Sequence, residues 1–205
     1  MKLYYAPGAC SLSPHIVSRE LGLPLELKKV DTKAKTVQGG GDYRKVNAKG
    51  YVPALELDDG RILTEGPAIV QYLADQKPEA GLAPKAGSFE RYRLQEWLNF
   101  LTSEIHKGFS PLFKPNTPEA YKAIAKENLG ARFDWLDQEL SGRDYLMGSA
   151  FSVADAYLFV LLNWTGFQQI DLARWPSLVA FQARVGARPK VQEALQAEGL
   201  LKKAA

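Results

Sequence analysis

The sequence predicts an α/β domain followed by an all-α domain. Short apolar runs of the strand type occur only in the first 77 residues, where they alternate with two helical stretches, and the longer apolar periods beyond them are helical. A stretch punctuated by Pro and Gly separates the two patterns at residues 77–84. We therefore expect a first domain at residues 1–77, a linker at residues 78–86 and a helical domain at residues 87–205.

In the first domain the expected order is β-α-β, a connector, and then β-β-α. The connector, residues 31–47, is polar and glycine-rich and predicts a loop with a short turn of helix. Asp58-Asp59-Gly60 indicates a hairpin between the last two strands, and Gly66-Pro67 indicates the start of the last helix. The expected strands are residues 2–5, 25–30, 54–57 and 61–63, and the expected helices are residues 13–22 and 66–76.

The second domain is expected to contain helices only. Ser152 and Asp155 have the spacing of a capping box, which predicts a helix start and a structural rather than a catalytic role for Asp155. Residues 156–162 are apolar on every side and predict the buried central helix of the domain. The other expected helices are residues 88–108, 118–140, 176–186 and 190–199.

The composition is that of an ordinary globular protein, with 46% hydrophobic and 24% charged residues. The net charge of +3 comes without a dense Lys/Arg cluster, which argues against nucleic acid as a partner. The longest apolar run, residues 156–162, is far shorter than the roughly 20 residues that cross a bilayer, and the N-terminus lacks a signal-peptide pattern. A single cysteine forms no disulfide framework, so we expect a cytoplasmic protein without a membrane partner.

Cys10, the only cysteine, lies between the first expected strand and the first expected helix. The unpaired N–H groups at a helix start favour an anion, and such a position lowers the pKa of a thiol. The placement therefore predicts a reactive thiolate whose thiol partner comes from another molecule. The alternative is a small buried apolar residue, and the local sequence favours neither reading.

Two further motifs point to a peptide-like ligand. An X-Pro bond before a strand, here Val52-Pro53, is a common place for a cis peptide that would turn the Val52 backbone groups outward, although a plain edge-strand proline is the alternative. Glu65 precedes the helix that begins at Gly66, so the helix N–H groups suit a carboxylate and Glu65 suits an ammonium group. The alternative for Glu65 is a solvated acid beside the helix dipole.

Together, the Ala9-Cys10-Ser11-Leu12 motif, the Val52-Pro53 pair, Glu65 and the Ser152–Asp155 cap resemble the bacterial beta class of cytosolic glutathione transferases. The resemblance covers essentially the whole chain, and a cysteine at this position, where other classes have Tyr or Ser, is specific to the class. It implies a thioredoxin-like N-terminal domain, a C-terminal helical bundle, a homodimer, and glutathione as a co-substrate without a metal.

The resemblance also implies roles for individual residues. Cys10 and His106 would be the catalytic residues that face the glutathione sulfur. Val52, with Pro53 after it, would pair its backbone with the cysteinyl unit of glutathione. Lys35 would meet the glycine carboxylate.

Glu65 and Gly66 would hold the γ-glutamyl end. Many relatives have Ser at the second of these positions, so Gly66 loses one hydrogen bond while it keeps the backbone N–H. His15, the second histidine, is expected to be structural. The helical domain would add contacts, some of them from the neighbouring subunit of a dimer, by Asn99, Ser103, Glu104, Ile105 and His106.

The implied reaction is conjugation of reduced glutathione to hydrophobic electrophiles, such as halogenated aromatic xenobiotics, in detoxification or degradation. Thiol exchange or reductive dehalogenation through a Cys10 mixed disulfide is an alternative, and a non-catalytic binding protein on the same scaffold is another. A glutaredoxin-like reductase is disfavoured because Ser13 stands where a resolving cysteine would, which leaves only a monothiol route. The electrophile pocket is expected to include Pro7, Gly8, Phe109, Phe113, Trp164 and Phe167.

Overall fold

The structure of the chain is a computed structural model that describes residues 1–201. These residues form two compact units: one contains residues 1–83 together with the C-terminal stretch from residue 187, and the other contains residues 84–186. Within residues 1–201, no helix is both long and apolar enough to span a bilayer.

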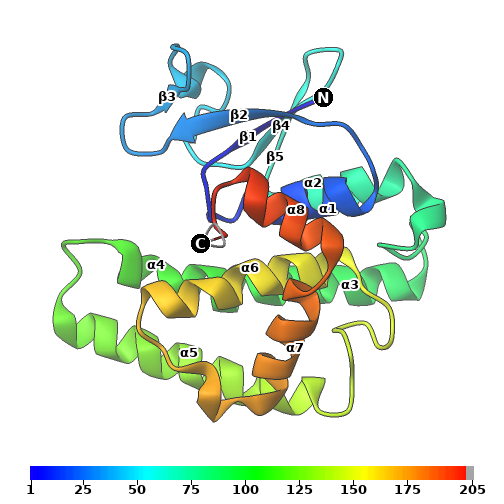
Figure 1. Cartoon of the computed structure of the whole chain (residues 1–205). Coiled ribbons are helices and arrows are strands. Elements are labelled where there is room, and N and C mark those ends of the chain that lie inside the picture. The colour runs from blue at the N-terminus through cyan, green and yellow to red at the C-terminus, as the bar shows by residue number, and fades with distance from the viewer. Residues whose placement is uncertain (202–205) are drawn as a thin grey trace. The chain divides into compact units, whose positions relative to one another are not determined.

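The first unit contains a five-stranded mixed sheet with the strand order β3-β2-β1-β4-β5 (Figure 1). β1 (Lys2–Tyr5) runs parallel to β2 (Glu26–Asp31) and antiparallel to β4 (Ala54–Glu56), which pairs with β5 (Ile62–Thr64). α1 (Leu12–Glu20) connects β1 to β2, and α2 (Gly66–Asp75) follows β5. The predicted β-α-β, β-β-α order is therefore confirmed.

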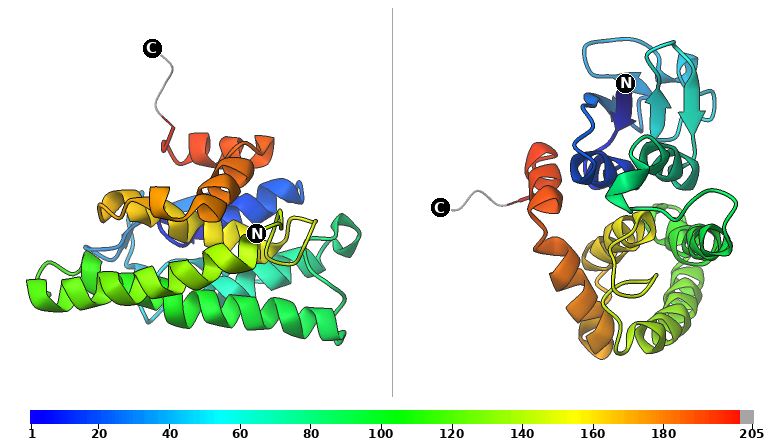
Figure 2. Two further views of the ribbon diagram at one scale, coloured as in Figure 1. Left: turned by 90° about the horizontal axis from the view of Figure 1, so that it is seen from below. Right: turned by 90° about the vertical axis from the view of Figure 1, so that its right-hand side faces the viewer.

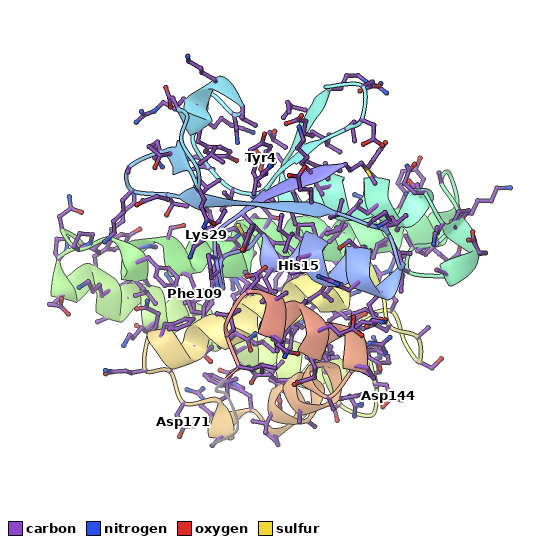
Figure 3. All side chains as sticks on the ribbon, turned by 45° about the horizontal axis from the view of Figure 1, so that its top comes forward. Tyr4, His15, Lys29, Phe109, Asp144 and Asp171 are labelled. Atoms are coloured by element: carbon purple, nitrogen blue, oxygen red, sulfur yellow. The ribbon has the colours of Figure 1, made fainter. Side chains whose placement is uncertain are left out.

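Alternate residues of β1 and β4 point to opposite faces of the sheet, and both faces are buried. Leu3 and Leu55 are register partners, and both side chains are fully buried. Tyr4, labelled in Figure 3, points to the opposite face, where it packs in a cluster with Tyr43 and Ala54. Because both faces are buried, a slip of β1 or β4 by one residue is strongly disfavoured, and the ends of these strands hold fixed positions.

The connector between β2 and β4 is more ordered than the sequence suggests. It contains β3 (Thr36–Val37), which pairs antiparallel with β2, and a 3₁₀ turn, η1 (Tyr43–Lys45), which confirms the expected short turn of helix. The loop prediction missed β3 because two residues among polar neighbours carry no period-2 pattern.

The last helix, α8 (Pro189–Ala197), packs on α1 and belongs to the first unit (Figure 1, red beside blue). Arg188, just before α8, forms a bidentate ion pair with Glu20 at the end of α1, with nitrogen–oxygen distances of 2.7 and 2.8 Å. The sequence instead predicts this segment as part of the helical domain at residues 87–205. An amphipathic pattern predicts a helix, but it does not tell which partner covers the apolar face.

The second unit is entirely helical, as expected (Figure 2). The helix predicted at residues 88–108 extends further: α3 (Phe89–Phe100) passes into a π-helical segment, η3 (Leu101–His106), and then into α4 (Lys107–Phe113). The remaining helices are α5 (Glu119–Leu140), α6 (Val153–Phe167) and α7 (Pro176–Gly186). A further 3₁₀ turn, η4, covers Leu172–Arg174, and η2 covers Pro78–Ala80 in the expected linker.

α6 is the buried centre of this unit, and its start is fixed by the predicted capping box. The Asp155 carboxylate accepts hydrogen bonds from the Ser152 backbone N–H at 2.8 Å and from the Ser152 hydroxyl at 2.7 Å. Its other oxygen accepts from the Leu146 N–H at 2.8 Å. Asp155 is fully buried and serves the cap, which confirms its structural role.

Candidate functional site

Cys10 lies in the turn between β1 and α1, as the sequence predicts. Its Sγ donates a hydrogen bond to the Val52 carbonyl oxygen at 3.3 Å. The Val52-Pro53 peptide bond is cis, as expected, and β4 begins directly after it. The thiol and the Val-Pro segment, 42 positions apart in the chain, thus meet at the same edge of the sheet.

The expected lowering of the Cys10 pKa is wrong. Burial raises the pKa of this thiol to about 12, and the negative charge of Glu65 adds to the increase. The backbone N–H groups of Cys10 and Ser11 act in the opposite direction, as helix-start groups should, but desolvation outweighs them. Cys10 is therefore a neutral thiol at neutral pH, which agrees with its role as a hydrogen-bond donor to Val52.

One segment, residues 49–52, contacts three of the residues expected to bind a ligand. Val52 accepts the hydrogen bond from Cys10, and the Gly50 carbonyl accepts a hydrogen bond from Lys35 Nζ at 2.9 Å. The Lys35 ammonium also lies 5.6 Å from the ring centroid of Tyr51, which makes a cation–π contact. The structure therefore brings Cys10 and Lys35 to the short stretch of chain that contains Val52.

Glu65 is tied to the same segment through Lys49. The Lys49 ammonium forms an ion pair with the Glu65 carboxylate and donates a hydrogen bond to the Thr64 hydroxyl at 3.0 Å. Glu65 precedes α2 and adopts a positive φ of 71°, a backbone conformation that is uncommon for a residue with a side chain. The exposed Glu65 carboxylate therefore already holds one ammonium group, that of Lys49.

Sequence reasoning missed Lys49 and Tyr51. Lys49 supplies the ammonium that Glu65 holds, and Tyr51, with 68% of its side chain exposed, lies under Lys35. The signal was their position in the three residues before Val52-Pro53, since residues beside a backbone that is expected to face a ligand are themselves candidates for contact.

The second unit holds the other expected site residues on the turn of η3 and the end of α3. Asn99 and Ser103 are exposed, and Glu104 is ion-paired with Arg132 of α5 at 2.7 Å. Ile105 is fully buried, so its side chain is part of the core and only its backbone is available to a ligand. A cavity of about 320 Å³ on this unit is lined by Ser103, Glu104, Lys107, Gly108, Asn128, Leu129 and Arg132.

His106 ends the π-helical segment and belongs to an aromatic cluster. Its ring meets Trp164 of α6 edge-to-face, with 4.8 Å between the ring centroids. Trp164 in turn meets Phe109, labelled in Figure 3, and Phe113 at 5.6 and 5.4 Å. Of the residues expected to line an electrophile pocket, three therefore form one aromatic group with His106, whereas Phe167 is 65% exposed at the end of α6. Pro7 and Gly8 lie in the first unit.

A metal site was not expected. In the part of the chain that the structure describes, no three His, Cys, Asp or Glu residues are grouped so that they could hold a metal ion.

Comparison with known proteins decides the family. Residues 8–76 match the glutathione S-transferase N-terminal domain, and residues 100–189 match the glutathione S-transferase C-terminal domain. The glutathione S-transferase GstA of Escherichia coli O157:H7 is 47% identical, over 98% of this chain and 100% of the relative. The chain belongs to the glutathione S-transferase family.

Solved glutathione S-transferases agree in fold. The bacterial transferase BphK, solved as a ternary complex, is 58% identical, with a TM-score of 0.96 over 98% of this chain and 100% of that one. A sphingomonad glutathione S-transferase complexed with glutathione is 51% identical, with a TM-score of 0.95 over the same shares. The beta-class enzyme of Sphingomonas chungbukensis is 49% identical, with a TM-score of 0.96, again over 98% and 100%. The predicted thioredoxin-like domain, helical domain and beta-class membership are confirmed for this glutathione S-transferase.

Proposed function

We propose that this transferase conjugates reduced glutathione to hydrophobic electrophiles. The observation that carries the proposal is the contact of residues 49–52 with Cys10, Lys35 and Glu65, because these contacts bring a thiol, an ammonium group and a carboxylate to one peptide segment. A tripeptide with a central thiol and charged ends has the matching groups. The sphingomonad relative, 51% identical, was solved with glutathione bound.

The first unit would bind glutathione with four groups. The Lys35 ammonium takes the glycine carboxylate, and the Val52 backbone pairs with the cysteinyl unit. Glu65 exchanges the Lys49 ammonium for that of the γ-glutamyl end, while the N–H groups at the start of α2 take the carboxylate. In the second unit, Asn99, Ser103, Glu104 and the Ile105 backbone supply further contacts in a homodimer.

The reacting sulfur is that of glutathione. Its thiolate forms a bond to the electrophilic carbon, and a halide leaves with the electron pair of the carbon–halogen bond, or the thiolate adds to an activated alkene. Cys10, held neutral by burial, turns its S–H from the Val52 carbonyl to the glutathione thiolate and so lowers the pKa of the glutathione thiol. His106 is the second group proposed to face this sulfur.

A neutral Cys10 favours conjugation over the mixed-disulfide alternative. Thiol exchange proceeds through a thiolate, and a thiol with a pKa of about 12 is almost fully protonated at neutral pH. The electrophile is proposed to be a flat hydrophobic compound, such as a halogenated aromatic xenobiotic, because the aromatic cluster around His106 and the buried Trp164 ends in the exposed ring of Phe113. The proposed setting is detoxification in the cytoplasm, where a single unpaired cysteine stays reduced.

A homodimer is supported by the outer face of α3. Phe89 and Tyr92, three positions apart and therefore on one face, are 73% and 60% exposed. Large aromatic side chains left in water on one helix face are typical of an interface. Light scattering that gave twice the monomer mass would support the dimer, and a monomer with full glutathione affinity would contradict it.

Binding to immobilised glutathione followed by a chlorodinitrobenzene assay tests the proposal. We expect retention, elution by free glutathione, and conjugate formed in proportion to the enzyme. Lys35→Ala should weaken glutathione binding by about tenfold, whereas the exposed Lys33→Ala on the same loop should not. Retention without conjugation of any electrophile would favour the non-catalytic binding protein, and loss of retention would refute the ligand itself.

A further inference from the structure

The two histidines of the chain have chemically different partners. Nδ1 of His15 lies 2.9 Å from a carboxylate oxygen of Glu198. Nδ1 of His106 lies 2.6 Å from the hydroxyl oxygen of Tyr157. A carboxylate stabilises a charged imidazolium, whereas a phenol is a neutral partner that can donate a hydrogen bond to the ring nitrogen.

The Tyr157 side chain has a fixed position. It projects from the buried helix α6 and is only 2% exposed, and the cap formed by Ser152 and Asp155 fixes the start of this helix five residues earlier. The Tyr157 ring also meets the His106 ring edge-to-face, with 6.0 Å between centroids and 76° between planes. A buried phenol on a rigid helix is a well-defined partner for a histidine.

On the other side of the contact, the π-helical segment sets the direction of His106. An α-helix has 3.6 residues per turn, and a π-turn, which closes i→i+5 hydrogen bonds, inserts an extra residue and rotates every side chain after it. His106 is the last residue of that segment. The imidazole is thus held between the Tyr157 hydroxyl and the edge of Trp164.

We propose that Tyr157 is a positioning residue whose hydroxyl donates a hydrogen bond to Nδ1 of His106 and so holds the neutral imidazole in the tautomer with its ring proton on Nε2. The inference rests on the proposed function, in which His106 faces the glutathione sulfur. The hydrogen bond at one ring nitrogen decides which nitrogen carries the proton. With Nδ1 as the acceptor, Nε2–H becomes a donor aimed away from Tyr157, the kind of group that stabilises a thiolate or a negative charge developing on the electrophile.

Nitrogen-15 NMR tests the tautomer without reference to activity. The chain has two histidines, so labelled histidine gives two ring spin systems, and the His106→Gln variant identifies the signals of His106 by their loss. At pH 8.5, about two units above the usual histidine pKa, we expect His106 in the Nε2–H form. In Tyr157→Phe, which keeps the ring and removes only the hydroxyl, we expect a mixture of both tautomers. A protonated Nδ1 in the parent chain would overturn the proposal, and so would a tautomer ratio unchanged by Tyr157→Phe.

Kinetics provide the second readout. Tyr157→Phe should lower kcat with chlorodinitrobenzene about tenfold and leave KM for glutathione within about twofold, because the variant alters the orientation of the one donor that faces the glutathione sulfur and leaves the contacts to the two ends of glutathione in place. Thr165→Val is the matched control: it also removes a buried hydroxyl from α6, one that donates to the Leu162 carbonyl, and should leave kcat unchanged. Equal losses of kcat in both variants would reduce Tyr157 to a packing role and overturn the proposal.

The two proposals fail in distinguishable ways. A parent protein that neither binds glutathione nor forms the conjugate would refute the proposed function, while the NMR experiment would still decide the tautomer of His106. A parent that conjugates normally, with a Tyr157→Phe variant of unchanged kcat, would refute the inference alone.

Discussion

Glu198 and His15 stand 183 positions apart in the chain and form a buried pair, with 2.9 Å between Oε1 and Nδ1. The other carboxylate oxygen of Glu198 accepts a hydrogen bond from the Gly8 N–H at 3.0 Å. Gly8 lies two positions before Cys10 and has a positive φ of 70°. A residue that follows the last helix therefore holds the loop that carries the only thiol, which gives His15 the structural role expected from the sequence.

Replacing Glu198 tests this arrangement. Glu198→Gln keeps the size of the side chain but cannot accept at both oxygens, so one buried hydrogen bond is lost, and we expect a loss of about 1–3 kcal/mol in the free energy of unfolding. Glu193→Gln, at an exposed ion pair on the preceding helix α8, is the control and should change stability by less than about 0.5 kcal/mol. Urea denaturation measures both, and equal stability of the two variants would contradict the structural role of Glu198.

The alkylation rate of Cys10 should report a thiol of high pKa. Burial raises its pKa to about 12, so the rate with iodoacetamide should be low at pH 7 and still be rising at pH 10. Because Cys10 is the only cysteine, the modified mass is unambiguous. A rate that levels off with a midpoint below about 8.5 would mean that the helix-start N–H groups, rather than desolvation, dominate.

The proposed glutathione site can be tested by adding a side chain at Gly66. A side chain at this position would meet open space, and the φ of Gly66 is not in the left-handed region. Gly66→Ser should therefore be accommodated, and its hydroxyl should improve glutathione affinity by about fivefold, equivalent to about 1 kcal/mol. Gly66→Ala is the control, because it stiffens the helix start as Ser does but adds no hydroxyl. If calorimetry gave the alanine and serine variants the same affinity, the hydroxyl would have no γ-glutamyl partner.

The buried carboxylate of Asp155 should give an unusual dependence of stability on pH. Burial raises its pKa from 3.8 to about 6, against the hydrogen bonds from Leu146 and Ser152, which lower it. The folded chain therefore binds this proton more tightly than the unfolded chain, so the contribution of Asp155 to stability is greatest below about pH 4 and is lost as the pH rises to about 6.

Asp155→Asn removes that titration. The variant should be less stable at every pH, since one amide oxygen replaces two acceptors, but its stability should change less between pH 4 and 6 than that of the parent, by about 1–3 kcal/mol. Thermal unfolding across this range measures the difference. Parallel curves for parent and variant would place the pKa of Asp155 near its ordinary value.

The close packing of α4 on α5 can be tested at Gly108, with Gly130 as the control. A Cβ at Gly108 would lie 2.8 Å from Leu129, so Gly108→Ala should destabilise the protein by about 1–3 kcal/mol. A Cβ at Gly130 would meet Trp175 at an ordinary 3.9 Å, so Gly130→Ala should be neutral or stabilising by up to about 1 kcal/mol. Shortening Leu129 to Ala should remove the penalty at position 108; if the two changes simply add, the clash is not the cause.

The sequence predicts the helices and strands better than it predicts the pKa values and contacts of the side chains that meet between them. The position of Cys10 follows from a strand and a helix that are each visible in local patterns, and the cap of Asp155 follows from a three-residue spacing. The pKa of Cys10 does not, because desolvation depends on every element that covers the thiol, whereas the helix-start effect that we expected is local.

The same distinction explains the other misses. The ion pair of Lys49 with Glu65 joins residues 16 positions apart, and the contact of His106 with Tyr157 joins residues 51 apart. The local spacing of apolar residues does not predict contacts between residues so far apart in the chain. The π-helical segment at Leu101–His106 is also not predicted, because its six residues are too short a run for a change in the apolar period to be recognised.

The return of α8 to the first unit has a consequence for protein synthesis. The second unit is one continuous stretch, residues 84–186, and can complete its packing as soon as that stretch has left the ribosome. The first unit cannot, because Arg188, the partner of Glu20, and Glu198, the partner of His15, are made only after that stretch. At about 5–20 residues per second, residues 1–83 wait roughly 5–20 seconds for the segment that covers α1. The unit that carries Cys10 thus begins to form before the second unit and completes its packing after it, and a ribosome that stalls before residue 188 leaves it without the carboxylate that holds the thiol loop.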